Sequence, residues 1–263
     1  MKRTLLLLLT LFLLFGLFAC NEAPSSPAKQ SYVVYFNTSS LPYTVPEPAP
    51  VTALQGECVV EPMLSIEPTA GYYIVWSTSP TSFEAYDFSQ PVADSFTLYA
   101  IEAPRAYNVT YLVQHGTNSA KNPLTYTKET NNIVLKNPQT EFGYVFRCWC
   151  YFDDPDSVVT QIEKGTEGDL ILRARIEPVH FNILYAGGAE YNPNPSVYVF
   201  GETLVLQAPR RAGFIFTGYT IYNDPAHTAV TALTPEFVTQ NAAALRKENG
   251  SDIYLQANWE EES

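Results

Sequence analysis

Histidine is scarce in this chain, with three among 263 residues. His115, His180 and His227 lie far apart in sequence, and His115 sits in a Gln-His-Gly-Thr loop. A general base needs a reacting group within hydrogen-bond reach, and we interpret these separated histidines as solvated. The sequence also contains no Gly-x-Ser-x-Gly elbow, no HExxH pair and no P-loop. We therefore predict no catalytic residue, no cofactor and no enzymatic activity.

Basic residues are also few. Fifteen Lys and Arg stand against 27 Asp and Glu, which gives a formal net charge of −12 at pH 7. Nucleic acid binding depends on Lys and Arg that neutralise phosphates, and anionic lipid surfaces attract basic segments. The charge balance argues against both as partners. The acidic residues are scattered, and we interpret most of them as solvated residues that favour solubility.

Cysteine is rare, and its spacing does not suit a metal. The four cysteines are Cys20, Cys58, Cys148 and Cys150. A zinc site would need a second pair and a wider spacing. On a strand, the sulfurs of Cys148 and Cys150 would share one face with Cα atoms roughly 6.5–7 Å apart, near the upper limit for a disulfide. Two interpretations remain: small apolar side chains in a strand, or a disulfide from Cys58 to one of the pair.

One acidic cluster is dense enough to consider as a calcium site. Asp153-Asp154-Pro155-Asp156 offers hard oxygen ligands but lacks the glycine and distal glutamate of an EF-hand loop. A turn in which Asp side chains bond to the backbone is the simpler interpretation. We predict no metal site.

The first twenty residues have the character of an export signal. Lys2 and Arg3 are followed by the uncharged stretch Thr4–Ala19 and then by Cys20. This order is typical of a secretory signal, and the apolar stretch is shorter than the ~20 residues that span a bilayer comfortably. Leu17-Phe18-Ala19-Cys20 resembles the bacterial lipobox, in which the cysteine is lipidated and becomes the mature N-terminus. A plain secretory signal or an uncleaved anchor is the alternative.

We accordingly expect residues 1–19 to be a lipoprotein signal peptide, Cys20 the lipidation site, and residues 20–30 a Pro/Ser-rich tether. Acyl chains, at about 0.8 kcal/mol per buried methylene, would hold the protein on a membrane. Some Gram-negative lipoproteins are kept at the inner membrane by an aspartate after the cysteine. Asn21 stands there in this chain, so we expect the outer membrane or cell surface rather than the inner membrane.

The rest of the chain contains an internal repeat. Three strand-like segments lie 75 and 74 residues apart, each followed by a polar loop. These opening segments are Tyr32–Asn37, Tyr107–Leu112 and Phe181–Ala186. Each is followed by a predicted second strand that ends near a proline. These second strands are Glu57–Pro62, Asn132–Pro138 and Glu202–Pro209.

Each repeat then continues with a glycine, a run rich in aromatic residues and a short closing strand. The glycine-aromatic blocks are Gly71–Trp76, Gly143–Trp149 and Gly213–Tyr219. The closing strands are Leu98–Ile101, Leu172–Ile176 and Leu255–Trp259. We refer to Gly71, Gly143 and Gly213 as the signature glycines.

These patterns predict a mostly β chain of three tandem small modules. Val, Ile, Tyr, Phe and Thr dominate in runs of four to seven, and 20 prolines exclude a helical bundle. The predicted modules are repeat 1 (31–104), repeat 2 (105–178) and repeat 3 (179–263). Repeat 3 is expected to contain one short helix, Asn241–Glu248, which ends at Asn249-Gly250. Aromatic residues make up 14% of the chain and recur at matching places, which predicts one aromatic core per module rather than a shared ligand cleft.

The order of these segments resembles the Listeria–Bacteroides repeat, or internalin B-repeat. That family shows an opening strand, a proline, a Gly-Tyr-x-Phe-x-Gly-Trp-Tyr block, a polar turn and a closing Leu-Tyr-Ala-x-Trp. Repeat 3 matches best, through Gly213–Tyr219 and Trp259. Cys148 stands where the family prefers glycine, and Trp76 comes one residue early. The resemblance implies a β-grasp-like fold and exported, surface-held bacterial proteins whose repeats act as spacers or adhesive modules without enzymatic activity.

Three functions remain open. The leading hypothesis is a non-catalytic, membrane-anchored lipoprotein at the surface or in the periplasm, whose repeats act as spacers or protein-interaction modules. A carbohydrate-binding protein of a polysaccharide-uptake system is the alternative, since exposed tryptophans could stack on sugars. An accessory or inhibitor lipoprotein of an enzyme is the third. Under the leading hypothesis the repeat-signature residues form the core: Gly71, Trp76, Gly143, Trp149, Gly213, Tyr219 and Trp259.

Overall fold

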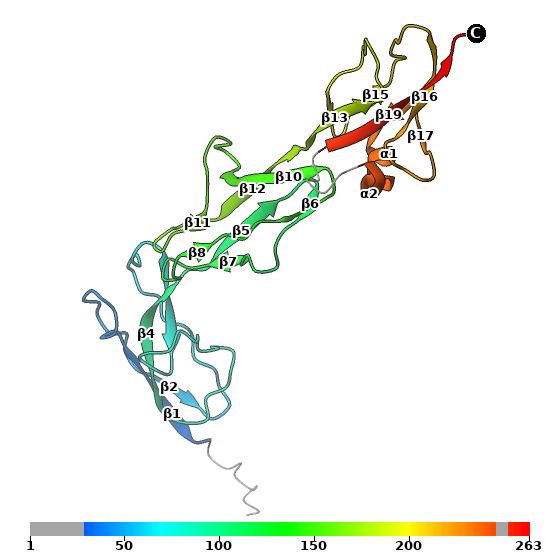
Figure 1. The fold of residues 1–263 in the computed structure, drawn as a ribbon. Coiled ribbons are helices and arrows are strands. Elements are labelled where there is room, and N and C mark those ends of the chain that lie inside the picture. The colour runs from blue at the N-terminus through cyan, green and yellow to red at the C-terminus, as the bar shows by residue number, and fades with distance from the viewer. Residues whose placement is uncertain (1–28, 246–251) are drawn as a thin grey trace, which may run out of the picture. The chain divides into compact units, whose positions relative to one another are not determined.

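The computed structural model describes residues 29–245 and 252–263 (Figure 1). The prediction of a mostly β chain is confirmed. The described residues divide into two compact units. One comprises the residues up to Pro68 together with Ile74–Ala103, and the other comprises Thr69–Tyr73 together with Pro104–Ser263. The predicted signal segment and Cys20 lie outside the described residues.

The first main sheet belongs to repeat 1. It has four strands in the order β2-β1-β4-β3. β1 pairs in parallel with β4 and antiparallel with β2. Alternate side chains of β1, among them Val34 and Phe36, are buried, as expected for a sheet with one covered face. The strands are β1 (Ser31–Asn37), β2 (Val51–Leu54), β3 (Tyr72–Ser77) and β4 (Phe96–Pro104).

The second main sheet, in repeat 2, keeps the same central pair. Its order is β10-β12-β5-β7. The opening strand β5 is parallel to the closing strand β12, and both outer strands are antiparallel to their neighbours. The strands are β5 (Tyr107–Leu112), β7 (Thr125–Tyr126), β10 (Tyr144–Tyr151) and β12 (Leu170–Pro178).

The third main sheet, in repeat 3, adds one strand to this plan. Its order is β14-β13-β19-β16-β17, with β13 parallel to β19 at the centre. All its other pairs are antiparallel. A parallel pair of first and last strands, flanked by outer strands, is therefore common to the three sheets. The strands are β13 (His180–Ala186), β14 (Val197–Val199), β16 (Phe214–Ile221), β17 (Ala229–Val230) and β19 (Asp252–Glu261).

Two of the three predicted second strands exist in part, but none of the three segments belongs to a main sheet. The strands that pair with the opening strands are β2, β7 and β14, which all precede the predicted segments. They are only two to four residues long, so they carry too little alternation to be read from sequence. Glu57–Pro62 contains no strand, and the other two segments contribute to separate two-stranded sheets. The minor strands are β6 (Gly116–Thr117) with β9 (Gln139–Thr140), β8 (Ile133–Val134) with β11 (Gln161–Ile162), and β15 (Leu204–Val205) with β18 (Ala232–Leu233).

The predicted single helix is also corrected. The described part of repeat 3 has two short helices, α1 (Pro235–Gln240) and α2 (Ala242–Leu245). Thr234 caps α1 by accepting a hydrogen bond from the Phe237 backbone N–H at 3.2 Å, and Pro235 occupies the first turn. Thr-Pro is a helix-start signal. The prediction of a helix at Asn241–Glu248 rested on the alanines there and did not use this signal. The end of the predicted helix, residues 246–248, lies outside the described residues.

Each main sheet covers its own hydrophobic cluster. Leu98 and Val34 are fully buried in repeat 1, Leu172 in repeat 2, and Ile253 and Leu255 in repeat 3. The cluster of repeat 3 is the largest of these and also takes up α1 and α2 through buried Val238 and Leu245. Most aromatic side chains therefore lie in one main core per repeat, built around the central pair of strands, and repeat 1 has a further small cluster of Val75, Ile101 and Ala103 that packs against Tyr99.

Truncation of a central core residue should destabilise repeat 2. Leu172→Ala removes a fully buried side chain from β12, and we expect a loss of about 2–5 kcal/mol in unfolding free energy from lost burial and the remaining cavity. The neighbouring Ile171 is 45% exposed, so Ile171→Ala should cost less than about 1 kcal/mol. Urea unfolding of both variants, followed by circular dichroism, measures the difference. Equal losses would contradict the assignment of the two faces.

Candidate functional site

The repeat-signature aromatics are the best candidates for a site, and in repeat 1 the key ring is internal. Trp76, near the end of β3, is 2% exposed. Its ring meets Phe36 edge-on at 5.2 Å between centroids. Its indole N–H donates to the backbone carbonyl of Pro62 at 3.2 Å. Both the face and the polar atom of this ring are thus used inside the module.

Repeat 2 builds the same arrangement around Trp149. This side chain is 2% exposed and donates its indole N–H to the Lys136 carbonyl at 3.1 Å. Tyr111 and Phe146 meet its ring edge-on, with centroids at 5.3 and 5.6 Å. Trp149 and Trp76 share a further contact: the carbonyl of each accepts a strand-like backbone hydrogen bond, from Val159 at 2.8 Å and from Tyr86 at 2.6 Å respectively. Trp76 therefore takes the place of Trp149, although it stands one residue nearer its signature glycine.

In repeat 3 a tyrosine replaces the tryptophan. Tyr219 is 4% exposed and contacts Tyr185 and Phe216, with centroids at 5.7 and 4.9 Å. Trp259, on β19, is partly buried and meets Phe216 at 5.6 Å. Its indole N–H donates to the Gly187 carbonyl at 2.7 Å. No described tryptophan therefore presents a free indole N–H.

Two asparagines that sequence reasoning missed complete these cores. Asn122 is 4% exposed, and it accepts from the Lys136 backbone N–H at 2.7 Å and donates to the Lys136 carbonyl at 2.9 Å. Asn194 repeats both bonds with Gln207, at 2.7 and 2.8 Å. A side-chain amide thus pairs with the backbone as a neighbouring strand would. The available signal was an Asn-Pro dipeptide in both loops.

The prolines of these dipeptides take part as well. The Tyr111 hydroxyl donates to the Pro123 carbonyl at 3.1 Å, and the Tyr185 hydroxyl donates to the Pro195 carbonyl at 2.9 Å. The Asn-Pro loops of repeats 2 and 3 are therefore bound to the opening strand through tyrosine and to the stretch after β8 or β15 through asparagine. The loops are parts of the core and not displayed binding loops.

The signature glycines occupy equivalent turns. Gly71, Gly143 and Gly213 have φ angles of 81°, 82° and 74°, a conformation that favours glycine. The carbonyl of each accepts a backbone hydrogen bond from a residue beyond the closing strand, at 2.8–3.0 Å. Five residues after Gly143, Cys148 follows a register shift in β10, and Gly218, five residues after Gly213, follows the matching shift in β16. Gly218 has a φ of 144°.

The cysteines are free thiols among the described residues. Cys58 is exposed and donates to the Ser89 carbonyl at 3.1 Å, whereas Cys150 is buried and donates to the Arg173 carbonyl at 3.4 Å. Cys148 is half-buried. The structure thus places the cysteines as apolar or weakly polar side chains, without the disulfide that the sequence left open.

The acidic segment of repeat 2 and its counterpart in repeat 3 are turns. Ser157 donates both its N–H and its hydroxyl to the Asp154 carbonyl. In repeat 3 the Asp224 carboxylate accepts backbone N–H groups of Ala226 and Thr228 at 3.0 and 2.9 Å. Hydrogen bonds from Thr228 and Ala226 lower the pKa of Asp224. Within the described residues, no group of three or more His, Cys, Asp or Glu side chains could hold a metal ion.

The histidines do not come together. His115 stacks on Tyr144, with centroids 3.9 Å apart, and lies 3.5 Å from Glu141. His180 is exposed at the start of β13, and His227 lies in the turn after Asp224. Each histidine therefore belongs to a different local structure. None of them shares a hollow with the acidic cluster.

Two shallow hollows on repeat 2 share Phe152. One, of about 600 Å³, is lined mainly by apolar groups of β5 and β12 together with Arg173. The other, of about 480 Å³, adds Asp153, Asp154 and Asp169. The Arg173 guanidinium lies 4.7 Å from the Phe152 ring centroid. Neither lining contains a histidine, cysteine or serine.

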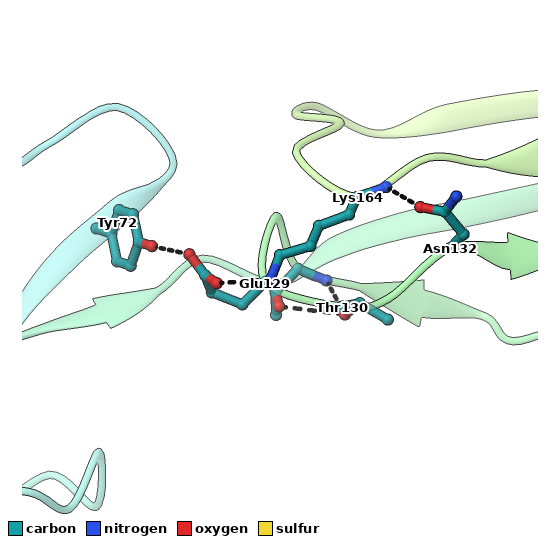
Figure 2. Close-up of polar contacts among 6 residues, drawn as sticks. Tyr72, Glu129, Thr130, Asn132 and Lys164 are labelled. Carbon is teal, nitrogen blue, oxygen red and sulfur yellow. Dashed lines mark hydrogen bonds and ion pairs between the residues drawn. The ribbon is translucent and has the colours of Figure 1, made fainter.

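A polar network lies at the start of β3 within the second unit (Figure 2). The Tyr72 hydroxyl donates to Glu129, whose carboxylate also lies 3.6 Å from the Lys164 ammonium. This hydrogen bond and the nearby lysines lower the pKa of Glu129. The Lys164 backbone N–H donates to Asn132 at 2.9 Å. The Glu129 carboxylate is therefore paired with both the Tyr72 hydroxyl and the Lys164 ammonium.

Removal of a buried asparagine should unfold the Asn-Pro loop of repeat 2. Asn122→Ala leaves the Lys136 N–H without its buried acceptor, and we expect a loss of about 1–3 kcal/mol in unfolding free energy. Asn137 is exposed, so Asn137→Ala should change stability by less than about 0.5 kcal/mol. Urea unfolding followed by tryptophan fluorescence measures both. A loss no larger than that of the control would contradict the role given to Asn122.

Alkaline pH should unfold the repeats through their buried tyrosines. Burial raises the pKa of Tyr111 and Tyr126 to about 12, from an ordinary value near 10. A phenol with a raised folded pKa contributes stability that is fully present below pH ~10 and is lost between pH ~10 and ~12. Part of the tyrosinate absorbance should therefore appear only as circular dichroism is lost in this window. Complete ionisation before any loss of structure would contradict the burial.

Comparison with known proteins agrees with the repeat in the sequence. No curated protein matches the chain. A family model, the Listeria-Bacteroides repeat domain, matches residues 107–175, which run from the start of β5 into β12. This match covers the second main sheet with its buried Trp149, its Asn-Pro loop and its glycine turn. Residues 107–175 are therefore similar to the Listeria-Bacteroides repeat domain.

Proposed function

We propose that this protein is an exported lipoprotein, anchored to a bacterial membrane through Cys20, whose β repeats serve as non-catalytic spacer or protein-interaction modules. The repeat domain suggests a surface or extracellular repeat protein. The finer assignment draws on the basic and apolar start of the chain and on the small residue before Cys20. We place the anchor at the outer membrane or cell surface.

The observation that carries this proposal is the use of the repeated side chains. Trp76, Trp149 and Tyr219 are each at most 4% exposed, and the Asn-Pro loops are bonded to the backbone of their own modules. Residues that recur between modules thus recur for packing. A binding or catalytic array would instead present its recurring side chains around a cavity.

A glycan-binding role receives less support. Sugar-stacking platforms need exposed aromatic faces, whereas two of the three tryptophans are 2% exposed and the third is partly buried. The indole N–H groups of all three tryptophans donate to backbone carbonyls within the modules. The acidic chain also offers few basic groups for an anionic polymer. A protein partner or a purely spacing role fits this surface better.

Lipidation of Cys20 is the direct test of the anchor. We expect the full-length chain, expressed in a bacterium fed a clickable fatty acid, to carry the label and to fractionate with membranes, because two or more acyl chains give stable anchoring. Cys20→Ala should abolish the label and release most of the protein from the membrane fraction. Cys58→Ala, at an exposed thiol, is the matched control and should behave as the unmodified chain.

The opposite pattern would overturn the anchor. Label that persists in Cys20→Ala would show acylation elsewhere, and label that disappears in Cys58→Ala would place it at Cys58. Membrane association that persists without any label would indicate an uncleaved apolar segment. No helix in the described part of the chain has the length and apolar character to cross a membrane.

A further inference from the structure

Two signature glycines meet the same element of the following repeat. A Cβ atom added to Gly143 would lie 2.3 Å from Cδ1 of Phe200, and one added to Gly71 would lie 2.5 Å from Cδ of Lys128. Each partner stands 57 residues after its glycine, since 128 − 71 and 200 − 143 are both 57. All four residues belong to the second unit. The coincidence points to one recurring contact.

The two partner residues occupy equivalent places in the fold. Lys128 lies two residues after Tyr126, and Phe200 lies two residues after Tyr198. These tyrosines are 4% and 1% exposed, and both pair with the first or second residue of the opening strand of their repeat. The segment that faces each glycine is therefore the one that directly follows β7 or β14, the short strand that pairs with the opening strand of the next repeat.

The contacts at Gly143 and Gly71 occupy equivalent positions but differ in chemistry. Phe200 makes an aromatic contact: Phe142 and Tyr144, on either side of Gly143, meet its ring edge-on at 5.7 and 5.5 Å. The Phe200 backbone N–H also donates to the Val179 carbonyl at 3.0 Å. The Phe200 ring thus lies against Gly143 and contacts the aromatic side chains on both sides of it.

Lys128 makes a polar contact at the corresponding place. Its ammonium donates to the Ala70 carbonyl at 2.7 Å and pairs with Glu167 at 2.6 Å. The same ammonium lies 5.3 Å from the Tyr72 ring centroid. Residues on both sides of Gly71 therefore contact Lys128, just as residues on both sides of Gly143 contact Phe200.

We infer that Gly71 and Gly143 act as a seat, or contact point, for the next repeat: because they lack a side chain, Lys128, two residues after β7, and Phe200, directly after β14, can lie against their turns. This role is additional to the positive φ, which all three glycines share. Gly213 separates the two effects, because no described atom lies within 4 Å of a Cβ placed on it. Alanine at Gly213 meets only backbone strain, whereas alanine at Gly143 meets strain and the Phe200 ring.

Thermal unfolding of the full-length chain, solubilised in detergent, tests this inference. Gly213→Ala should lower the Tm through φ strain alone, and Gly143→Ala should lower it by about 5 °C more through overpacking against Phe200. Gly71→Ala should fall between them, because the flexible Lys128 side chain can move aside at lower cost than a ring packed between two others. Equal Tm losses for Gly143→Ala and Gly213→Ala would contradict a contact between Gly143 and Phe200 that needs the missing side chain.

A second variant, Phe200→Ala, tests the contact without relying on the size of the Tm loss in Gly143→Ala. Phe200→Ala removes the ring and makes room for a side chain at position 143. In the double variant, Gly143→Ala should then lower the Tm only by about the amount that Gly213→Ala does. Strictly additive Tm losses from Gly143→Ala and Phe200→Ala would contradict direct contact. If Gly143→Ala fails to fold, the double variant should restore folding, and its failure to do so would count against the inference.

Discussion

The structure depends on burying one aromatic ring per repeat with its polar atom satisfied. Trp76 and Trp149 each donate their indole N–H to a backbone carbonyl near the predicted second strand, while edge-on aromatic neighbours cover their rings. A buried donor without a partner would cost about 1–3 kcal/mol, more than the roughly 0.5–1.5 kcal/mol that its hydrogen bond contributes. The ring therefore holds the irregular loops against the sheet. This is how modules of about 75 residues with 20 prolines in the chain can form cores at all.

The polar atoms of these core side chains are already hydrogen-bonded within the repeats. Among the described residues, these atoms are therefore not free to form a reactive site. The Tyr111 and Tyr185 hydroxyls and the amides of Asn122 and Asn194 bond to backbone atoms of their own module. The three indole N–H groups do the same. Acidic residues sit in turns or ion pairs at the surface. A repeat of this kind can be copied along a chain without altering any chemistry. That property is consistent with the proposed role as a spacer or interaction module.

The sequence predicted what depends on local pattern. The opening and closing strands came from runs of β-branched and aromatic residues, and their parallel pairing is consistent with the resemblance to a β-grasp. The short strands β7 and β14 could not be predicted, because their positions are set by pairing with the opening strand. Asn122 and Asn194 were missed for a similar reason: their bonds join positions 13 or 14 residues apart. The helix α1 was missed although Thr234-Pro235 signals its start.

The contact between Gly143 and Phe200 was likewise invisible in one sequence, since nothing local relates residues 57 apart. The positive φ of the turn is enough to explain a glycine at position 143. The nearby Phe200 ring shows a second reason, because it leaves no space for a side chain there. Its polar counterpart at Gly71 shows that the position of the contact is kept while its chemistry changes. Repeats can therefore diverge in sequence at such places and still use the same surface.

The central claim is that the repeated aromatic rings face inward, and tryptophan accessibility tests it most directly. Single-tryptophan variants that retain only Trp76 or only Trp149, with phenylalanine at the other two positions, report each ring separately. The account predicts blue-shifted emission and little quenching by iodide for both variants in the native chain, with full quenching after unfolding in urea. Red-shifted emission with strong native quenching of either ring would contradict it, because the rings would then form a solvent-facing array.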